Sequence, residues 1–149
     1  MAIEGGCRCG SVRYRVTAEQ MPPVYCCHCL TCQTWSGSAF SQQAVVAEAQ
    51  IEVTKGEVGV YLNITESGAE STQCLCGTCH TRLWNTNSAR PGLAVIRAGT
   101  FDVSATIVPR AHIWTKRKQR WIVLADEVPR WSEGAPPADF VAALNRPQP

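Results

Sequence analysis

Residues 26–32 read CCHCLTC, which puts four cysteines and one histidine into seven positions with no charged residue among them. Thiols this crowded serve as disulfides, as a redox couple, or as ligands of a metal ion that is either fully enclosed or left open for chemistry. The rest of the chain decides between these uses.

The composition of the 149-residue chain favours metal sites over disulfides. Its start, MAIEGGCRCG, lacks the basic and then apolar pattern of a secretory signal, and no apolar run of about 18 residues appears. We therefore expect a cytoplasmic protein with no membrane partner, in a compartment where thiols stay reduced. Nine cysteines is an odd number, so disulfide pairing would leave one over. The formal net charge of +2 gives no reason to expect a nucleic-acid partner.

Short runs of alternating polar and apolar residues predict a mainly β fold. In SVRYRV (11–16), Val12, Tyr14 and Val16 fall on one face and two arginines fall on the other. Similar runs, separated by glycine and proline, predict further strands at 39–47, 51–56, 58–65, 81–86, 93–101 and 111–115. Of the tryptophans, Trp84, Trp114 and Trp121 lie in strand-like runs and are predicted to pack in the core.

The end of the chain predicts one short helix. Two prolines precede ADFVAALN (138–145), whose apolar residues recur at helical spacing. With no repeat or long linker, the chain is expected to form a single domain, 1–149, with its core over about residues 5–131 and a C-terminal tail over 132–149.

Two motifs far apart in the chain supply one complete set of zinc ligands. GGCRCGS (5–11) contains C-x-C, and LCGTCH (75–80) contains C-x-x-C, the turn by which two thiolates reach one metal ion. Structural zinc takes four ligands, so the two pairs predict one closed site, made of Cys7, Cys9, Cys76 and Cys79. A redox C-x-x-C at 76–79 is the alternative, although no thioredoxin-like βαβ pattern surrounds it.

A second set, Cys27, Cys29 and Cys32, supplies three thiolates and no obvious fourth ligand. If 25–29 is extended, Cys27 and Cys29 point to one face, and a turn over LTC (30–32) returns Cys32 to them. Three protein ligands with one open position is the arrangement of catalytic zinc, so these three cysteines are the predicted catalytic residues.

The alternative is that a fourth residue closes this second site and makes it structural. The alternation of faces in an extended segment argues against Cys26 and His28 as that residue. Cys74 and His80 stay open as candidates.

These motifs, in this order, resemble the glutathione-dependent formaldehyde-activating (GFA) family, which includes centromere protein V. The resemblance rests on GGCRCGSVRYRV, CHCLTCQTWSGSAFS, CGTCHTRLW, RPGLAVIRAGTFD and PRAHIW, and runs from about Gly5 to Trp131. It implies a zinc-binding β-tent fold, with a structural zinc on the C-x-C and C-x-x-C cysteines and a labile one on the C-x-C-x-x-C cysteines. It also implies a carbon–sulfur lyase activity that combines glutathione with formaldehyde to give S-hydroxymethylglutathione.

The chain departs from the family pattern at three positions. His80 stands where the family usually has glycine after the C-x-x-C, so it must accept the backbone conformation of that turn. Cys26 and Cys74 are extra to the pattern and leave open an altered or regulated site. A non-catalytic zinc- or glutathione-binding scaffold, and a zinc or redox sensor that uses these two cysteines, are therefore the alternative functions.

The expected partners are a small thiol such as glutathione and an aldehyde substrate. Trp35 and Ser36 follow the three-cysteine turn and are predicted to flank the thiol's pocket. Glutathione carries two carboxylates, and basic residues near the end of the core are predicted anchors for them unless they form a solvated turn. These residues are Arg110, Lys116, Arg117, Lys118 and Arg120.

Overall fold

The computed structural model describes residues 2–147, so the predicted domain and tail include positions 1, 148 and 149 outside the described residues. The chain divides into two compact units. The first unit comprises 1–22 and 44–106, and the second comprises 23–43 and 107–149. The single-domain interpretation stays a prediction. Within residues 2–147, no helix has both the length and the apolar character needed to span a membrane.

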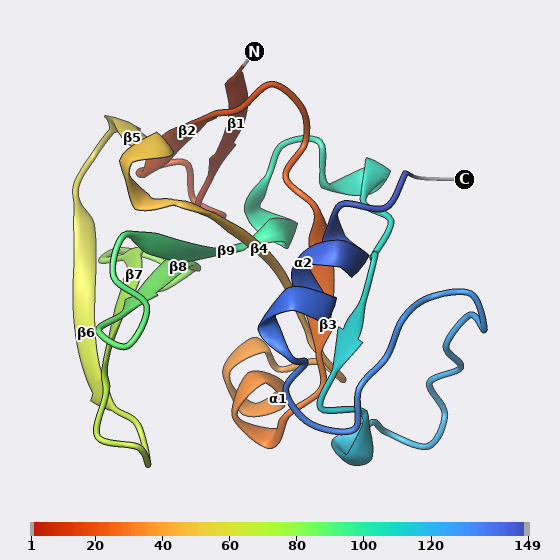
Figure 1. Cartoon of the computed structure of the whole chain (residues 1–149). Helices are drawn as coiled ribbons and strands as arrows, with labels where there is room; N and C mark the ends of the chain where they lie inside the picture. The colour runs from red at the N-terminus through yellow and green to blue at the C-terminus, as the bar shows by residue number, and fades with distance from the viewer. Residues whose placement is uncertain (1, 148–149) are drawn as a thin grey trace. The chain divides into compact units, whose positions relative to one another are not determined.

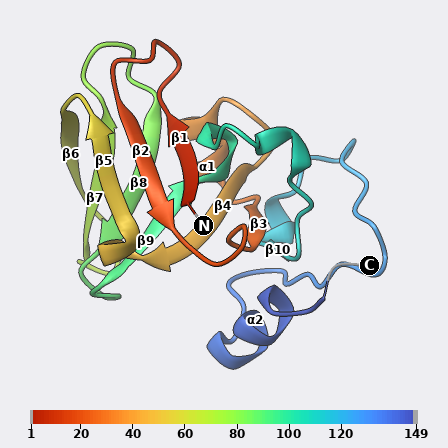
Figure 2. The same cartoon turned by 90° about the horizontal axis from the view of Figure 1, so that it is seen from above.

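The first unit contains two antiparallel arrangements of strands. One is a three-stranded sheet in the order β1-β2-β5 (Figure 2). The other follows the order β9-β8-β7-β6, with the end of β4 beside β9. The strands are β1 (Ala2–Gly6), β2 (Arg13–Thr17), β4 (Ser41–Ala47), β5 (Ile51–Lys55), β6 (Val58–Ile64), β7 (Glu70–Cys76), β8 (Arg82–Asn87) and β9 (Leu93–Arg97). Short 3-10 turns lie at η1 (Glu48–Gln50), η2 (Ala98–Thr100) and η3 (Ser104–Thr106).

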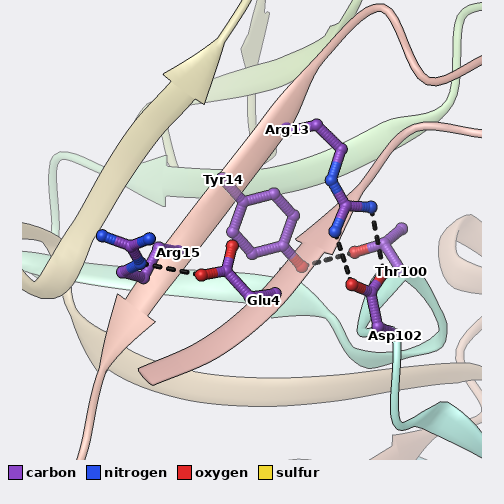
Figure 3. A network of polar contacts seen from close by, with 6 residues as sticks. All are labelled: Glu4, Arg13, Tyr14, Arg15, Thr100 and Asp102. Atoms are coloured by element: carbon purple, nitrogen blue, oxygen red, sulfur yellow. Dashed lines mark hydrogen bonds and ion pairs between the residues drawn. The ribbon is translucent and has the colours of Figure 1, made fainter. Parts of the chain in front are cut away.

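Alternation along β2 explains how the first unit is held together. Tyr14 is fully buried, and its hydroxyl lies 2.6 Å from the Oγ1 of Thr100 (Figure 3). The flanking arginines point to the other face, where Arg13 donates two hydrogen bonds to Asp102 and Arg15 donates to Glu4 at 2.8 Å. These contacts tie β2 to β1 and to the segment after β9.

The second unit is built around β3 (Val24–Cys27), which leads after two residues into the helix α1 (Leu30–Ser36) (Figure 1). Its strands follow the order β10-β3-β4, with β10 (His112–Ile113) parallel to β3. The turn η4 (Thr115–Arg117) follows β10. The C-terminal helix α2 (Pro137–Leu144) packs on β3, because the rings of Tyr25 and Phe140 meet edge to face at 4.9 Å.

The prediction of a mainly β fold with one short C-terminal helix is confirmed. The predicted strands at 93–101 and 111–115 are longer than the observed ones, which end at Arg97 and Ile113. Strands β1, β3 and β7 were not predicted, and the turn expected over 30–32 is the start of α1. Trp84 is buried as expected, whereas the core prediction for Trp121 is wrong, since this residue is 71% exposed.

Candidate metal centre

Four sulfurs of the first unit converge on one point. The Sγ atoms of Cys7, Cys9, Cys76 and Cys79 all lie within 4.8 Å of one another. The Sγ of Cys9 is 3.6 Å from that of Cys7 and 3.8 Å from that of Cys76. Two thiolates bound to one zinc at ~2.3 Å in a tetrahedron are roughly 3.8 Å apart. This four-cysteine group therefore fits a closed zinc site, and its cysteines form no disulfide.

Backbone turns hold the four-cysteine group in place. After β7, the N–H groups of Thr78 and Cys79 point at the Sγ of Cys76, at 3.4 and 3.5 Å. His80 closes this turn with its N–H on the carbonyl oxygen of Cys76 at 2.9 Å and adopts a φ of 59°. The prediction that His80 takes the conformation usual for glycine is confirmed. The side-chain hydrogen bond with Thr81, and then its backbone N–H, lower the pKa of Cys79 to about 5.

Three sulfurs of the second unit form a second group. The Sγ atoms of Cys27, Cys29 and Cys32 lie within 4.8 Å of one another. Cys27 ends β3, Cys29 is the N-cap residue of α1, and Cys32 lies in the helix's first turn. Because α1 coils back over its first turn, the N–H of Cys32 reaches the Sγ of Cys29 at 3.3 Å. The sequence prediction of a turn that returns Cys32 to the pair agrees with this geometry.

Hydrogen bonding inside this three-cysteine group distributes charge unevenly. Bonds from the thiols of Cys27 and Cys32, together with the backbone N–H of Cys32, hold the pKa of Cys29 far below its usual value. The bonds that Cys27 makes to Cys29 and Cys32, and its burial, raise the pKa of Cys27. The group is therefore ready to present one thiolate at the start of α1, and a metal ion would draw the protons from the other two.

Four residues were considered as a fourth ligand for the three-cysteine group: Cys26, His28, Cys74 and His80. Among the described residues, none of them belongs to either cysteine group. His28 is fully buried and contacts His112 and Phe40 instead. Burial raises the pKa of Cys26 to about 12, and burial followed by the charge of Glu48 raises that of Cys74 to about 11. A thiol that stays protonated at neutral pH reacts slowly with oxidants, and Cys26 is also fully buried, which disfavours the use of these two cysteines in a sensor.

An open cavity of about 530 Å³ lies along one face of α1 in the second unit. A chain of hydrogen bonds forms its wall: the indole N–H of Trp121 donates to the Oε1 of Gln119 at 2.7 Å, and the Nε2 of Gln119 donates to the Oε1 of Gln33 at 3.3 Å. Gln33 in turn donates to the carbonyl oxygen of His28 at 2.8 Å, and His28 lies between Cys27 and Cys29 in the chain. The lining residues are Gln33, Thr34, Gly37, Ser38, Ala39, Gln119 and Trp121.

Trp35 and Ser36 are absent from this lining, so their role in ligand binding stays a prediction. The hydroxyl of Ser36 lies 3.4 Å from the carbonyl oxygens of Gln33 and Phe40. The sequence analysis did not identify the cavity residues, because it predicted a turn over 30–32 and no helix beyond it. Residues 33, 34 and 37 recur at helical spacing, and this signal would have placed them on one face of a helix.

The basic residues divide into two sets. Arg110 donates to the carbonyl oxygens of Leu144 and Arg146, both at 2.8 Å, at the end of α2. Lys116 forms an ion pair with Glu133, and Lys118 donates to the carbonyl oxygen of Ile122 at 2.6 Å. These three cations are thus engaged with the protein itself. Arg117 and Arg120 are exposed, and within residues 2–147 neither forms an ion pair.

Two curated proteins are similar in sequence to this chain. A protein of Halomonas elongata named "Putative glutathione-dependent formaldehyde-activating enzyme" is 26% identical over 126 residues, covering 82% of this chain and 80% of that protein. An uncharacterized lyase of Schizosaccharomyces pombe is 29% identical over 90 residues, covering 59% of this chain and 61% of that protein.

A crystal structure of a Rhodobacter sphaeroides protein shares the fold with a TM-score of 0.55 at 18% identity, covering 72% of this chain and 93% of that one. The family model described as "Glutathione-dependent formaldehyde-activating enzyme" matches residues 2–117, a range that contains all seven cysteines of the two groups. The chain therefore belongs to the glutathione-dependent formaldehyde-activating enzyme family.

Proposed function

We propose that this protein is a zinc-dependent carbon–sulfur lyase of the cytoplasm. It would join glutathione to formaldehyde to give S-hydroxymethylglutathione, or act on a related adduct of a thiol and an aldehyde. The observation that carries the proposal is the three-cysteine group, in which the sulfurs of Cys27, Cys29 and Cys32 converge without a fourth ligand among the described residues. Family membership and the names of the relatives support a lyase-like activity.

The two cysteine groups would bind two zinc ions with different roles. The four-cysteine group would hold a structural zinc, since its four thiolates complete a tetrahedron. The three-cysteine group would hold a second, more labile zinc. When bound there, this zinc would supply a Lewis-acidic centre that keeps an entering thiol ionised at neutral pH, although a free thiol has a pKa of about 8.5.

The chain's own residues would bind and orient the substrates. The cavity beside α1 would receive the body of the thiol, with its peptide planes against the exposed indole of Trp121. Arg117 and Arg120 would meet the two carboxylates, and Trp35 and Ser36 would flank the entry to the three cysteines. Residues that hold the sulfur and the aldehyde carbon within reach would accelerate the addition by positioning.

The overall reaction is an addition that needs no oxidant. A bond forms between the thiol sulfur and the aldehyde carbon, and the π electron pair of the carbonyl moves to oxygen. That oxygen takes up the proton that the thiol gives away, so the product is a hydroxymethyl thioether. The reverse reaction breaks the same carbon–sulfur bond.

The experiment must separate catalysis from the spontaneous condensation of glutathione with formaldehyde. Exchange between free and adduct formaldehyde can be followed by NMR with labelled formaldehyde, with zinc-loaded wild-type protein and with Cys29→Ser at equal concentrations. We expect faster exchange with the wild type than with buffer, and no acceleration with the variant. Equal exchange in all three samples would remove the enzymatic proposal and leave a binding module.

A further inference from the structure

Gln43 is a buried polar residue that contacts one of the three cysteines. It lies on β4 within the second unit, and only 7% of its surface is exposed. Its side-chain Nε2 lies 3.3 Å from the Sγ of Cys32, which is hydrogen-bonding distance for a sulfur acceptor. An amide nitrogen donates hydrogen bonds and has no lone pair to offer a metal, so Gln43 approaches the group as a donor.

The other two sulfurs of the group receive their donors from the motif itself. The backbone N–H of Cys32 reaches the Sγ of Cys29 at 3.3 Å, and the backbone N–H of Cys29 bonds to Cys27. The amide on Cys32 comes from a different element, eleven residues further along the chain. The C-x-C-x-x-C motif therefore does not itself supply the donor to Cys32, which depends on the tertiary fold.

We propose that Gln43 is a positioning residue of the three-cysteine site, whose amide N–H holds the Sγ of Cys32 in place as a metal ligand. This inference rests on the proposed function, because it takes the group to be a metal site. Gln43 would contact neither the substrate thiol nor the aldehyde. It acts through Cys32.

The charge of the loaded site gives the physical reason. A divalent cation and three thiolates sum to one negative charge, and an entering thiolate adds a second. Buried charge is costly unless hydrogen bonds compensate it. A neutral amide offsets the charge on Cys32 without competing for the metal, whereas a carboxylate at the same place would add a fourth ligand and close the site.

The variant Gln43→Met tests this role, because methionine keeps the volume of the side chain and removes the donor. Competition with a chelator should show that the three-cysteine group of the variant binds zinc roughly 10- to 100-fold more weakly. This is the usual effect of losing a hydrogen bond to a metal ligand. The first zinc should be retained at wild-type affinity. In the cobalt-substituted protein, the sulfur-to-metal charge-transfer bands should move to lower energy, because a sulfur without its hydrogen bond gives up charge more easily.

Gln73→Met is the matched control. Gln73 is also a buried glutamine on a strand, but its amide bonds to Ser71 and Arg82 in the first unit. Its replacement should leave the affinity of the second zinc and the cobalt bands unchanged. A Gln43→Met protein with wild-type affinity and unshifted bands would overturn the role of Gln43 alone. A wild-type protein that takes up one metal ion in total would overturn the proposed function together with this inference.

A measurement on the wild type keeps the test decisive if Gln43→Met does not fold. With ¹¹³Cd in place of zinc, an N–H···S bond to a metal-bound sulfur transmits a scalar coupling from the metal to the amide proton. We expect this coupling for one side-chain amide proton of Gln43. Its absence in a protein loaded at both sites would refute the contact.

Discussion

The Nε2 atom of His28 lies 3.0 Å from the Nδ1 atom of His112, and both rings are buried in the second unit. At least one of the two rings must be neutral to accept the hydrogen bond, because two imidazolium rings would face each other with two protons and two positive charges. The pair joins β10 to the segment that carries the three cysteines, so its protonation bears on the stability of that segment.

This pair predicts a loss of stability in acid. Burial, followed by the charges of His28 and Arg130, lowers the pKa of His112 to about 4, and burial and then Lys118 lower that of His28. The unfolded chain therefore binds protons before the folded one as pH falls. The stabilisation that the folded protein gains from neutral His112 is complete above the unfolded pKa of about 6.5. It is lost progressively as the pH falls towards 4, and the loss for His112 amounts to roughly 2–3 kcal/mol.

Urea unfolding at several pH values between 7.5 and 4.5 checks this prediction, with metal content followed in parallel. His112→Gln should be less stable than the wild type at pH 7.5 but should show a flatter dependence on pH. An unchanged pH dependence would mean that other groups, the metal-binding thiols first among them, control the acid transition.

Single replacements should separate the two cysteine groups. Cys76→Ser removes a ligand from a site that joins segments about 67 residues apart, as the Cys9–Cys76 contact shows. Structural zinc contributes roughly 10–16 kcal/mol of apparent binding energy, against a total domain stability of about 5–15 kcal/mol. We therefore expect this variant to unfold. Cys29→Ser disturbs a group whose three cysteines all lie in the six-residue stretch 27–32. This variant should stay folded, keep the zinc of the four-cysteine group and lose the zinc of the three-cysteine group.

Thermal melts and zinc analysis of the two variants provide the readout. If Cys29→Ser unfolds the protein as severely as Cys76→Ser does, the three-cysteine site is structural, and the open coordination position loses its support.

Trp121 should contribute to thiol binding. Its indole is 71% exposed, yet its N–H is held by Gln119, so a ligand meets a ring that is already oriented. Replacement by leucine should weaken glutathione binding by roughly two- to tenfold, since one aromatic contact is worth about 0.5–1.5 kcal/mol. Calorimetric titration of the zinc-loaded protein measures the change. Val123→Ser, at a neighbouring residue that is 92% exposed and outside the cavity lining, is the control and should bind as the wild type does.

The turn at His80 should tolerate glycine and reject β-branched residues. His80 has a φ of 59°, a left-handed conformation that costs an ordinary residue about 1–2 kcal/mol. His80→Val should therefore lower the melting temperature and weaken zinc binding at the four-cysteine group. His80→Gly relieves the strain but adds roughly 0.5–1 kcal/mol of freedom to the unfolded chain, so it should melt close to the wild type. Equal melting temperatures for all three proteins would show that the metal alone dictates the turn.

Local patterns in the sequence were sufficient to predict the two cysteine groups, several strands and the C-terminal helix, because these features depend on residues close together in the chain. The division of seven cysteines into four and three followed from ligand spacing, and both groups are present in the structure. Strand alternation placed Tyr14 and Val16 in the core, and helical spacing identified α2. The unusual conformation of His80 was implied by the family resemblance, because the family usually has glycine after the C-x-x-C.

Only the tertiary structure decided which residues surround the three cysteines. The contacts of Gln43 with Cys32 and of His28 with His112 span 11 and 84 residues, and no local pattern marks them. Trp121 lies in an apolar-looking run, yet burial depends on whether another element packs over the side chain, and among the described residues Trp121 stays 71% exposed. Periodicity reports which residues share a face of one element. What lies against that face is set by contacts between elements distant in the chain, and these the sequence does not display.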